Sequence, residues 1–351
     1  MNALEARLDA ILKDPLRTAA AGGALGYVGL DIPPDLLLAH PQGSCHLPWR
    51  IAQPTPLADE WLESSFPIWA RSILEDWAAG RFDGFAQVLF TRGEDISQRL
   101  YYYVCELQRR GKIAGPEALI LDIARIQRAS SRQYSIRSLR HLAGQLQLTD
   151  EALKRGIHKA NASRALFGKL RATRCARGSV YEKWARASLF ADVASLTDVS
   201  GSDPAASSVG RLILAGSSPP DDRLHRCVES CGWAVVDEFY DRNLERLGAA
   251  VDPQGDDLMA GVMKSWLAHT FLARNLNNPD ARLLAEVQQA KADAVILWFA
   301  RDDEALAWQV PRLRRALDEA GTPHVSLSAR AWNFEDGSAA EIRSFLGGLR
   351  P

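Results

Sequence analysis

Short apolar runs alternate with longer segments of helical periodicity along most of this chain. In the segments between the runs, apolar residues recur every three to four positions, which predicts amphipathic helices. Strands that alternate with such helices indicate parallel sheets rather than hairpins. The apolar runs predict buried strands at 24–30, 45–51, 85–90, 211–216, 233–236, 295–299 and 324–328.

The helical segments are expected at 35–40, 58–80, 95–111 and 116–130, and through most of the arginine-rich region 130–195. Within that region, Thr149 and Asp150 precede a helical stretch. Their side-chain oxygens can accept the free amide hydrogens of a first helical turn, so they predict the N-terminal cap.

Two domains are expected because 351 residues exceed the usual size of a single core. A stretch rich in Ser, Gly and Asp at 197–210 predicts a linker. We therefore expect an N-terminal α/β domain with a helical extension at 1–200 and a C-terminal α/β domain at 201–351. Each half begins with a short strand, a proline-bearing loop and a helix, which favours one βαβ plan for both. The predicted fold class is α/β, with two Rossmann-like or flavodoxin-like parallel-sheet domains and a helical connecting region.

Composition narrows the class of protein. Hydrophobic residues make up 47% of the chain, and the net charge of −1 favours neither nucleic acid nor an anionic membrane as a partner. No apolar run reaches the roughly 18–20 residues that a membrane span needs, and the charged N-terminus lacks the apolar core of a signal peptide. The five cysteines form no CxxC pair, which is typical of reduced thiols. We expect a cytoplasmic protein.

Polar loops follow several predicted strands, where parallel sheets bind ligands. The first is the segment Gly216-Ser217-Ser218-Pro219-Pro220, whose backbone amides could cradle a phosphate or simply turn the chain into a helix. Two more loops are strongly charged, and their side chains could form an interdomain ion-pair set, remain solvated, or, for the arginines, contact phosphate groups. These side chains are Arg92, Glu94, Asp95, Arg301, Asp302, Asp303 and Glu304.

Other candidates have ordinary structural interpretations. Acidic residues after the strand at 233–236 could transfer protons or could favour a helix dipole; they are Asp237, Glu238 and Asp241. His46 beside Cys45 suggests a thiol pair only weakly, because neighbours on a strand face opposite ways. The histidines show no zinc-binding spacing, so no metal site is expected.

Several segments in order resemble one known family. They are GYVGLDIPPDLLLAHPQGSCHLPWRI (26–51), ISQRLYYYVCELQRRG (96–111), KANASRALFGKLRA (159–172) and RLILAGSSPPDDRLHRCVESCGWAVVDEFYD (211–241). Together they resemble subunits of the 2-hydroxyacyl-CoA dehydratase / benzoyl-CoA reductase family, from about residue 24 to 349. The resemblance implies a pair of related subunits, homo- or heterodimeric, with an acyl-CoA ligand. It also implies a [4Fe–4S] cluster held by three cysteines, to which a separate ATP-driven activator supplies an electron.

The matching segments here contain no cysteine: they read SSFPIWARS, TRGED and ARDDE. By this resemblance, Phe66, Arg92 and Asp302 occupy the former cluster-ligand positions, so no cofactor is predicted. The expected function is a cluster-free subunit that binds or shapes an acyl-CoA site beside a cluster-bearing partner. Alternatives are a non-enzymatic interaction or regulatory protein and a redox-independent acyl-CoA enzyme that uses carboxylates; catalytic residues stay unassigned. The residues expected to bind acyl-CoA are Arg92, Gly216, Ser217, Ser218 and Arg301.

Overall fold

The computed structural model describes residues 3–19, 22–126, 128–173, 177–192, 210–242, 244–268 and 278–349. The first half contains α1 (Ala3–Lys13), α2 (Leu16–Ala19), β1 (Leu25–Val28), α3 (Pro34–Leu37), β2 (Ser44–His46), α4 (Pro56–Trp61), α5 (Ile68–Ala78), β3 (Gln87–Thr91), α6 (Asp95–Arg109) and β4 (Glu117–Leu121). A helical region follows, with α7 (Ala129–Gln145), α8 (Asp150–Thr173) and α9 (Gly178–Ala187).

The second half repeats the alternation of strands and helices. Its elements are β5 (Gly210–Gly216), α10 (Arg223–Ser230), β6 (Trp233–Phe239), η2 (Leu244–Leu247), α11 (Leu258–Ala268), α12 (Pro279–Ala290), β7 (Ala294–Ala300), α13 (Glu304–Ala307), α14 (Val310–Glu319), β8 (His324–Arg330) and α15 (Ser338–Gly348).

Each half forms a four-stranded parallel sheet, and the two sheets have the same strand order. The N-terminal sheet runs β2-β1-β3-β4 and the C-terminal sheet runs β6-β5-β7-β8. In both, the first strand is central and the chain then proceeds to opposite sides, which is the flavodoxin-like arrangement. The α/β fold class predicted from the sequence is therefore confirmed, and so is the shared plan of the two halves.

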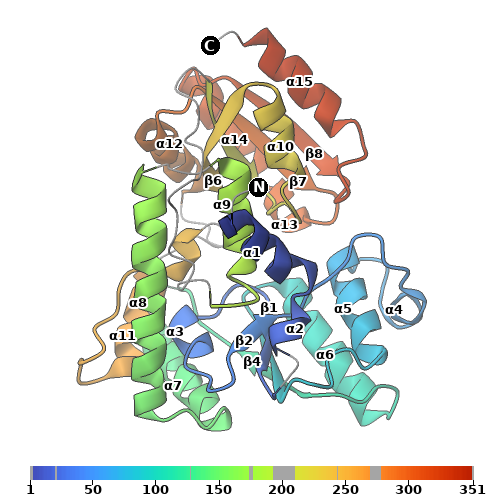
Figure 1. Cartoon of the computed structure of the whole chain (residues 1–351), viewed down its shortest axis with the longest axis vertical. Helices are drawn as coiled ribbons and strands as arrows, with labels where there is room; N and C mark the ends of the chain where they lie inside the picture. The colour runs from blue at the N-terminus through green and yellow to red at the C-terminus, as the bar shows by residue number, and fades with distance from the viewer. Residues whose placement is uncertain are drawn as a thin grey trace.

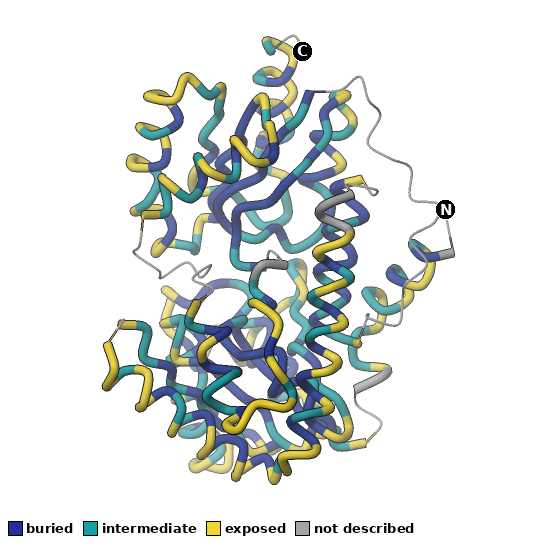
Figure 2. The backbone as a smooth tube through the Cα atoms, turned by 90° about the vertical axis from the view of Figure 1, so that its left-hand side faces the viewer, coloured by how far each residue is buried: buried dark blue, intermediate teal, exposed yellow. Residues whose placement is uncertain are grey.

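Alternate residues of the central strands fill separate apolar layers on the two faces of each sheet. In the N-terminal sheet, Leu89 packs into one layer, whereas Val88 and Phe90 pack into the other. In the C-terminal sheet, Ile296 and Ile213 belong to opposite layers in the same way. The buried residues accordingly lie inside each half, and the exposed residues lie on the helices and loops around them (Figure 2).

Several helices connect the two halves. The long helix α8 runs beside both, and α9 and α1 lie between the sheets (Figure 1). Helix α11 comes from the second half of the sequence, yet its Val262 and Trp266 pack in the same apolar layer as Leu25 of β1. The second half of the sequence thus contributes a helix to the core of the N-terminal sheet. The predicted boundary at 200/201 and most of the predicted linker lie outside the described residues, so the proposed division stays a prediction.

Two predicted helices are wrong in detail. The segment 116–130 contains strand β4, which pairs in parallel with β3, and α7 begins only at Ala129. A short apolar run such as 118–121 fits a strand as well as a helix, and pairing with β3 decides between them. The predicted helix 58–80 is divided into α4 and α5 because Pro67 cannot continue a helix and instead lies at the start of α5.

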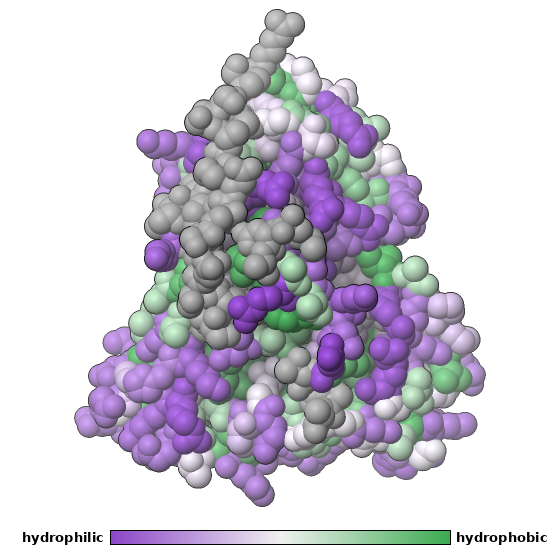
Figure 3. All heavy atoms as spheres, in the orientation of Figure 1, coloured by the Kyte–Doolittle hydropathy of each residue, from purple (hydrophilic) through white to green (hydrophobic). Residues whose placement is uncertain are grey.

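Hydrophilic side chains cover most of the outer surface of both halves in the view of Figure 3, and apolar residues show at the level between them. No helix within the described residues is long and apolar enough to cross a membrane.

Candidate functional site

A cavity of about 690 Å³ lies between the two sheets. In a sheet of order 2-1-3-4, the chain reverses direction between the first and third strands, and ligands bind beyond the carboxyl ends of those strands. The cavity meets both such points. From the N-terminal sheet, it is lined by Gly29 and Leu30 after β1 and by Glu94 and Asp95 after β3. From the C-terminal sheet, it is lined by Ser218 and Pro220 after β5 and by Asp302, Asp303 and Glu304 after β7.

Gly216 shapes the C-terminal side of the cavity. Its φ of +115° lies in the region that favours glycine, and a Cβ at this position would collide with the backbone oxygen of Trp298 in β7. The missing side chain therefore lets the end of β5 turn close against β7. The backbone amide of Ser217 donates to the same Trp298 oxygen at 2.9 Å, which fixes the following serines at the cavity.

Ser217 connects the two central strands of the C-terminal sheet through its hydroxyl group. Its Oγ accepts the Ala300 amide hydrogen at 3.0 Å and donates to Asp303 Oδ2 at 2.7 Å. Burial raises the pKa of the Asp303 carboxyl, and the hydrogen bond from Ser217 opposes that rise. Asp303 also lines the cavity. It is therefore a carboxyl group with a raised pKa at a ligand-binding position, a combination typical of acid–base residues.

Arg242 and Arg186 place two guanidinium groups on the cavity wall. Both donate to Glu182 Oε1, Arg242 through Nη2 at 2.8 Å and Arg186 through Nε at 3.0 Å. Glu182 is fully buried, so it holds both cations in fixed orientations. Arg242 also donates from Nη2 to Pro219 O and from its backbone amide to Ser218 Oγ at 3.0 Å. Its Nε is buried without a partner in the described part of the chain.

His46 extends from the end of β2 and lines the same cavity. Burial, together with the charges of Arg246 and Arg242, lowers the pKa of His46 to about 4, although a hydrogen bond with the Leu47 backbone acts in the opposite direction. Its ring is therefore neutral near pH 7. Cys45, the preceding residue, points into an apolar core, where its Sγ donates to His46 O at 3.3 Å. Burial raises the pKa of the Cys45 thiol to about 12, so the two side chains do not form a reactive pair.

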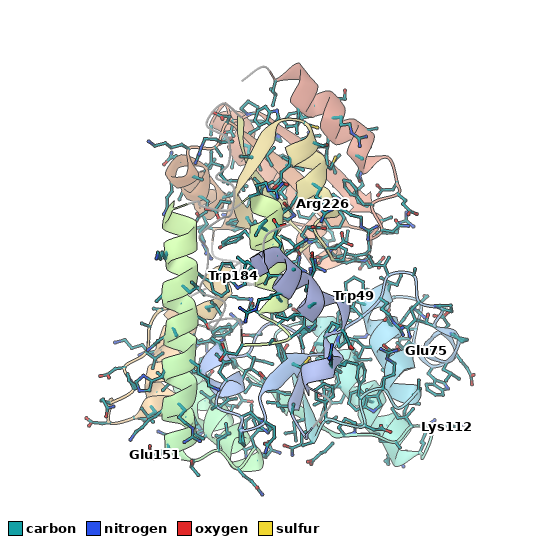
Figure 4. All side chains as sticks on the ribbon, viewed as in Figure 1. Trp49, Glu75, Lys112, Glu151, Trp184 and Arg226 are labelled. Carbon is teal, nitrogen blue, oxygen red and sulfur yellow. The ribbon has the colours of Figure 1, made fainter. Side chains whose placement is uncertain are left out.

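Tryptophans form part of the cavity wall. Trp49 follows β2 and lies at the level between the two halves in Figure 4. Its ring meets Trp332, from beyond β8, edge to face with centroids 5.7 Å apart. Trp332 Nε1 also donates to Asp302 Oδ2 at 3.1 Å. The two halves of the molecule are thus in aromatic contact beside the cavity. Trp308 also lines it and is 86% exposed.

On the N-terminal side, Arg99 of α6 is the cation at the cavity. Its guanidinium lies over the Phe66 ring, 4.4 Å from the centroid, and donates to Glu63 Oε2 at 2.6 Å. Phe66 is buried and also meets Tyr103 edge to face. Phe66 therefore fills a small aromatic core behind the cavity rather than lining it, whereas its neighbours Ser65 and Pro67 do line it.

The predicted charged loops meet only in part. Arg92 is largely exposed and donates to Asp122 Oδ2, at the end of β4, at 2.6 Å. The interdomain ion-pair set, one of the alternatives predicted for the charged loops, is not found for Arg92 and Asp302. Asp302 accepts from Trp332 of its own half, and within the described residues no ion pair joins it to Arg92. Arg301 is exposed and its backbone amide pairs with Arg330 O. Neither arginine is among the described residues that line the cavity.

The acids predicted to follow the strand at 233–236 lie in different environments: Asp237 and Glu238 belong to β6 itself, and Asp241 follows it. Glu238 accepts from or donates to the buried His225 Nε2 at 2.6 Å, away from the cavity lining. Asp241 lines the cavity. Sequence reasoning named Asp241, Ser218 and Asp303 as site candidates, considered His46 only as a weak partner of Cys45, and missed Arg186 and Arg242. The one local signal was the spacing of Glu182 and Arg186, four positions apart in a helical segment.

Cysteine placement bears on whether a [4Fe–4S] cluster fits these residues. No cysteine lines the cavity among the described residues. Cys45 lies in an apolar core, Cys105 lies along α6, and Cys227 and Cys231 lie at α10; Cys175 falls outside the described residues. Within the described ranges, no three His, Cys, Asp or Glu side chains are arranged to hold a metal ion. Iron–sulfur clusters need several thiolates around one point, so these residues do not fit one at the cavity.

The family model of the 2-hydroxyglutaryl-CoA dehydratase D-component matches residues 52–343, which is more than half of the chain. The matched region includes the helices α4 and α5 before β3, the helix α12 before β7, and the loops after β3, β5 and β7. No curated protein matches this chain by sequence.

Proposed function

We propose that this chain, which belongs to the 2-hydroxyglutaryl-CoA dehydratase D-component family, is a subunit without an iron–sulfur cluster that binds an acyl-CoA in the cavity between its two sheets. A related, cluster-bearing subunit is its proposed partner, as a homologous half of a dimer. The family description itself names a component of a larger enzyme, which supports pairing. The observation that carries the proposal is the position of the cavity at both strand-reversal points.

The lining of the cavity suits an acyl thioester. A volume of about 690 Å³ falls within the usual range of small-molecule sites. Apolar and aromatic side chains such as Leu30, Trp49 and Phe190 can surround an acyl chain and its pantetheine arm, while Ser218 and Arg242 supply donors for polar atoms. The nucleotide end of CoA would lie outside this volume. Trp308 and Arg301 are close to each other in the sequence and both exposed, and we propose that they contact the adenine and a phosphate of CoA.

The absence of a cluster is proposed from the available ligands. Asp302, at a former ligand position, accepts a hydrogen bond from Trp332 instead. Phe66 is buried in an aromatic group, and Arg92 pairs with Asp122. All three side chains therefore have structural roles that a thiolate would not fill.

Binding of a CoA thioester tests the site. Butyryl-CoA is titrated calorimetrically into the wild-type chain, into Ser218→Phe and into the control Ser230→Phe, which changes an exposed residue on α10. Filling the cavity should weaken binding at least about tenfold, whereas the control should bind as the wild type does. Equal affinity of all three proteins would refute binding in this cavity, and no binding by the wild type would refute the proposed function.

Iron analysis tests the proposed lack of a cluster. The chain is purified without oxygen, alone and together with a cysteine-bearing subunit of the same family. The expected result is no iron and no broad absorbance near 400 nm for this chain alone, with about four irons per partner subunit. Stoichiometric iron in this chain alone would contradict the proposal.

A further inference from the structure

The C-terminal strand ends bring a carboxylate and hydrogen-bond donors to one side of the cavity. Two consecutive serines organise them: Ser217 donates to Asp303 Oδ2 at 2.7 Å, and Ser218 Oγ accepts the Arg242 amide hydrogen at 3.0 Å. Asp303 comes from the loop after β7, and Arg242 follows β6, so three neighbouring strands converge on this turn. Ser218, Arg242 and Asp303 all line the cavity.

The hydrogen bonds of these groups leave specific atoms for a ligand. Ser217 Oγ accepts from Ala300, so its single hydrogen is directed to Asp303 Oδ2. The Leu306 backbone amide in the first turn of α13 also favours the Asp303 carboxylate. Each carboxylate oxygen can accept more than one hydrogen bond, so Oδ1 keeps capacity for a ligand proton. Ser218 Oγ accepts from Arg242, and its own hydrogen is donated to no acceptor in the described ranges. It can therefore donate to a carbonyl oxygen.

We propose that Asp303 is a catalytic base that exchanges the hydrogen on the carbon next to a thioester carbonyl, with Ser218 and Arg242 receiving the carbonyl oxygen. This activity rests on the proposed acyl-CoA site and needs no cluster. Asp303 Oδ1 takes the proton as the C–H bond breaks. The electron pair of that bond moves into the bond to the carbonyl carbon, and the carbonyl oxygen becomes an enolate oxygen. The Asp303 carboxyl group then exchanges its proton with water, and transfer of this solvent-derived proton to the same carbon re-forms the C–H bond and restores the thioester.

The arrangement suits this step electrostatically. Negative charge develops on the carbonyl oxygen, and oriented donors in a partly closed cavity stabilise such charge more strongly than water does. The guanidinium group of Arg242 adds a positive charge that Glu182 holds in place. The ring of His46, which also lines the cavity, is neutral and therefore does not repel the Arg242 cation. No oxidant or reductant is consumed, because every atom that leaves the substrate is replaced from the solvent.

Deuterium uptake measures the activity directly. Butyryl-CoA is incubated with the full chain in D₂O, and its mass is followed by mass spectrometry. The wild-type chain should add deuterium next to the carbonyl faster than the protein-free solution does. Asp303→Asn should slow this uptake by about 100-fold or more, and Ser218→Ala should slow it by about 100-fold. Asp318→Asn, a change to an exposed carboxylate on α14, should leave the rate unchanged.

Calorimetric titration of the same proteins separates binding from exchange. Asp303→Asn should still bind butyryl-CoA with nearly wild-type affinity, which a merely structural role would not predict alongside lost exchange. Binding without wild-type exchange above the protein-free rate would overturn this inference and leave the proposed function standing. Neither binding nor exchange would overturn both. Should Asp303→Asn fail to fold, Ser217→Ala removes the hydrogen bond that orients the carboxylate, and unchanged exchange in that variant would also overturn the inference.

Discussion

The two sheets share a strand order but use the ends of their central strands differently. A serine bridges those ends in both halves. In the N-terminal sheet, Ser97 Oγ accepts the Thr91 amide hydrogen and donates to Val28 O, each at 3.2 Å. In the C-terminal sheet, Ser217 accepts from Ala300 but donates to a side chain, Asp303. Ser97 therefore joins two backbone groups, whereas Ser217 holds a carboxylate beside the cavity.

The polar groups at the strand-reversal point of the N-terminal sheet are hydrogen-bonded to other side chains of the protein. Asp31 follows β1 and is buried, and it accepts hydrogen bonds from Arg125 and from Trp266 Nε1, the latter at 3.1 Å. Trp266 belongs to α11, so this carboxylate also anchors a helix from the second half of the sequence. A side chain at Gly93 would collide with Asp31, so the loop after β3 packs directly against this carboxylate. Identical topology therefore fixes where a ligand can bind, but the side chains decide which half supplies the chemistry.

The largest expected effect is the difference in the loss of stability when Asp31 or Asp303 is replaced by alanine. Asp31→Ala should lower the free energy of unfolding by about 3 kcal/mol or more, because it leaves Arg125 and Trp266 without their partner. Asp303→Ala should cost about 1 kcal/mol, since it breaks one hydrogen bond at a cavity. Unfolding in guanidinium chloride measures both. Equal costs would mean that the two ends of the molecule are equally structural.

Gly29, after β1, and Gly216, at the end of β5, allow the backbones of the two sheets to be compared. Gly216→Ala would place a Cβ against the backbone oxygen of Trp298, which cannot move without distorting β7. Gly29→Ala would meet the Thr91 side chain, which can rotate. Both positions have positive φ, and this alone costs an alanine about 1–2 kcal/mol. We expect Gly216→Ala to cost about 1 kcal/mol more than Gly29→Ala in the same unfolding measurement. The reverse order would show that the C-terminal turn is the more adaptable one.

Two buried histidines give the halves opposite responses to pH. Burial lowers the pKa of His225, but the hydrogen bond and charge of Glu238, with the charges of Glu182 and Glu229, raise it overall above 6.5. Its stabilisation is complete below 6.5 and is lost as pH rises through the raised pKa. Burial lowers the pKa of His46 to about 4, so its contribution is complete above 6.5 and is lost as pH falls toward 4.

Unfolding free energies measured from pH 4 to 9 test these signs. His225→Gln should flatten the loss of stability above pH 6.5, and His46→Gln should flatten the loss below it. Each histidine contributes at most about 1.4 kcal/mol per pH unit. The exposed His141→Gln serves as the control and should change neither limb. A variant that flattened the opposite limb would contradict the assigned direction of its pKa shift.

Sequence patterns predicted the sheets better than the contacts between them. The strands of both halves, the parallel pairing and the capping of α8 by Thr149, whose Oγ1 accepts the Ala152 amide hydrogen at 3.2 Å, follow from local periodicity and local bonding. The anchoring of Trp266 on Asp31 does not, because it joins residues 235 positions apart in the chain. Strand β4 was mistaken for a helix for a similar reason, since only its pairing with β3 identifies it.

The candidate site shows the same difference between what local sequence position predicts and what depends on distant contacts. Sequence placed Ser218 and Asp303 at strand ends, where the cavity lies, because parallel sheets dictate that position. It missed Arg242, because the placement of that side chain depends on Glu182, a buried residue of the distant helix α9. Arg186 lies one turn from Glu182 on the same helix, a spacing that fits an ion pair but does not by itself place either residue at the cavity. For Arg92 it left an interdomain ion pair, solvation and a phosphate contact open, because only the three-dimensional arrangement selects Asp122 as the partner of this exposed arginine.

The smallest expected effect concerns Arg92, whose side chain is 54% exposed in its ion pair with Asp122. A double-mutant cycle with Arg92→Ala and Asp122→Ala should give a coupling of about 0.2–1 kcal/mol, because exposed ion pairs are weak and screened by salt. The matching cycle of Arg92→Ala with Asp302→Ala should be additive within about 0.5 kcal/mol, because these two residues belong to different halves and have different partners. Coupling should fall further in high salt for Asp122 only. A larger coupling to Asp302 than to Asp122 would mean that the two loops meet after all, and that the N-terminal strand ends contribute charge to the same site as the C-terminal ones.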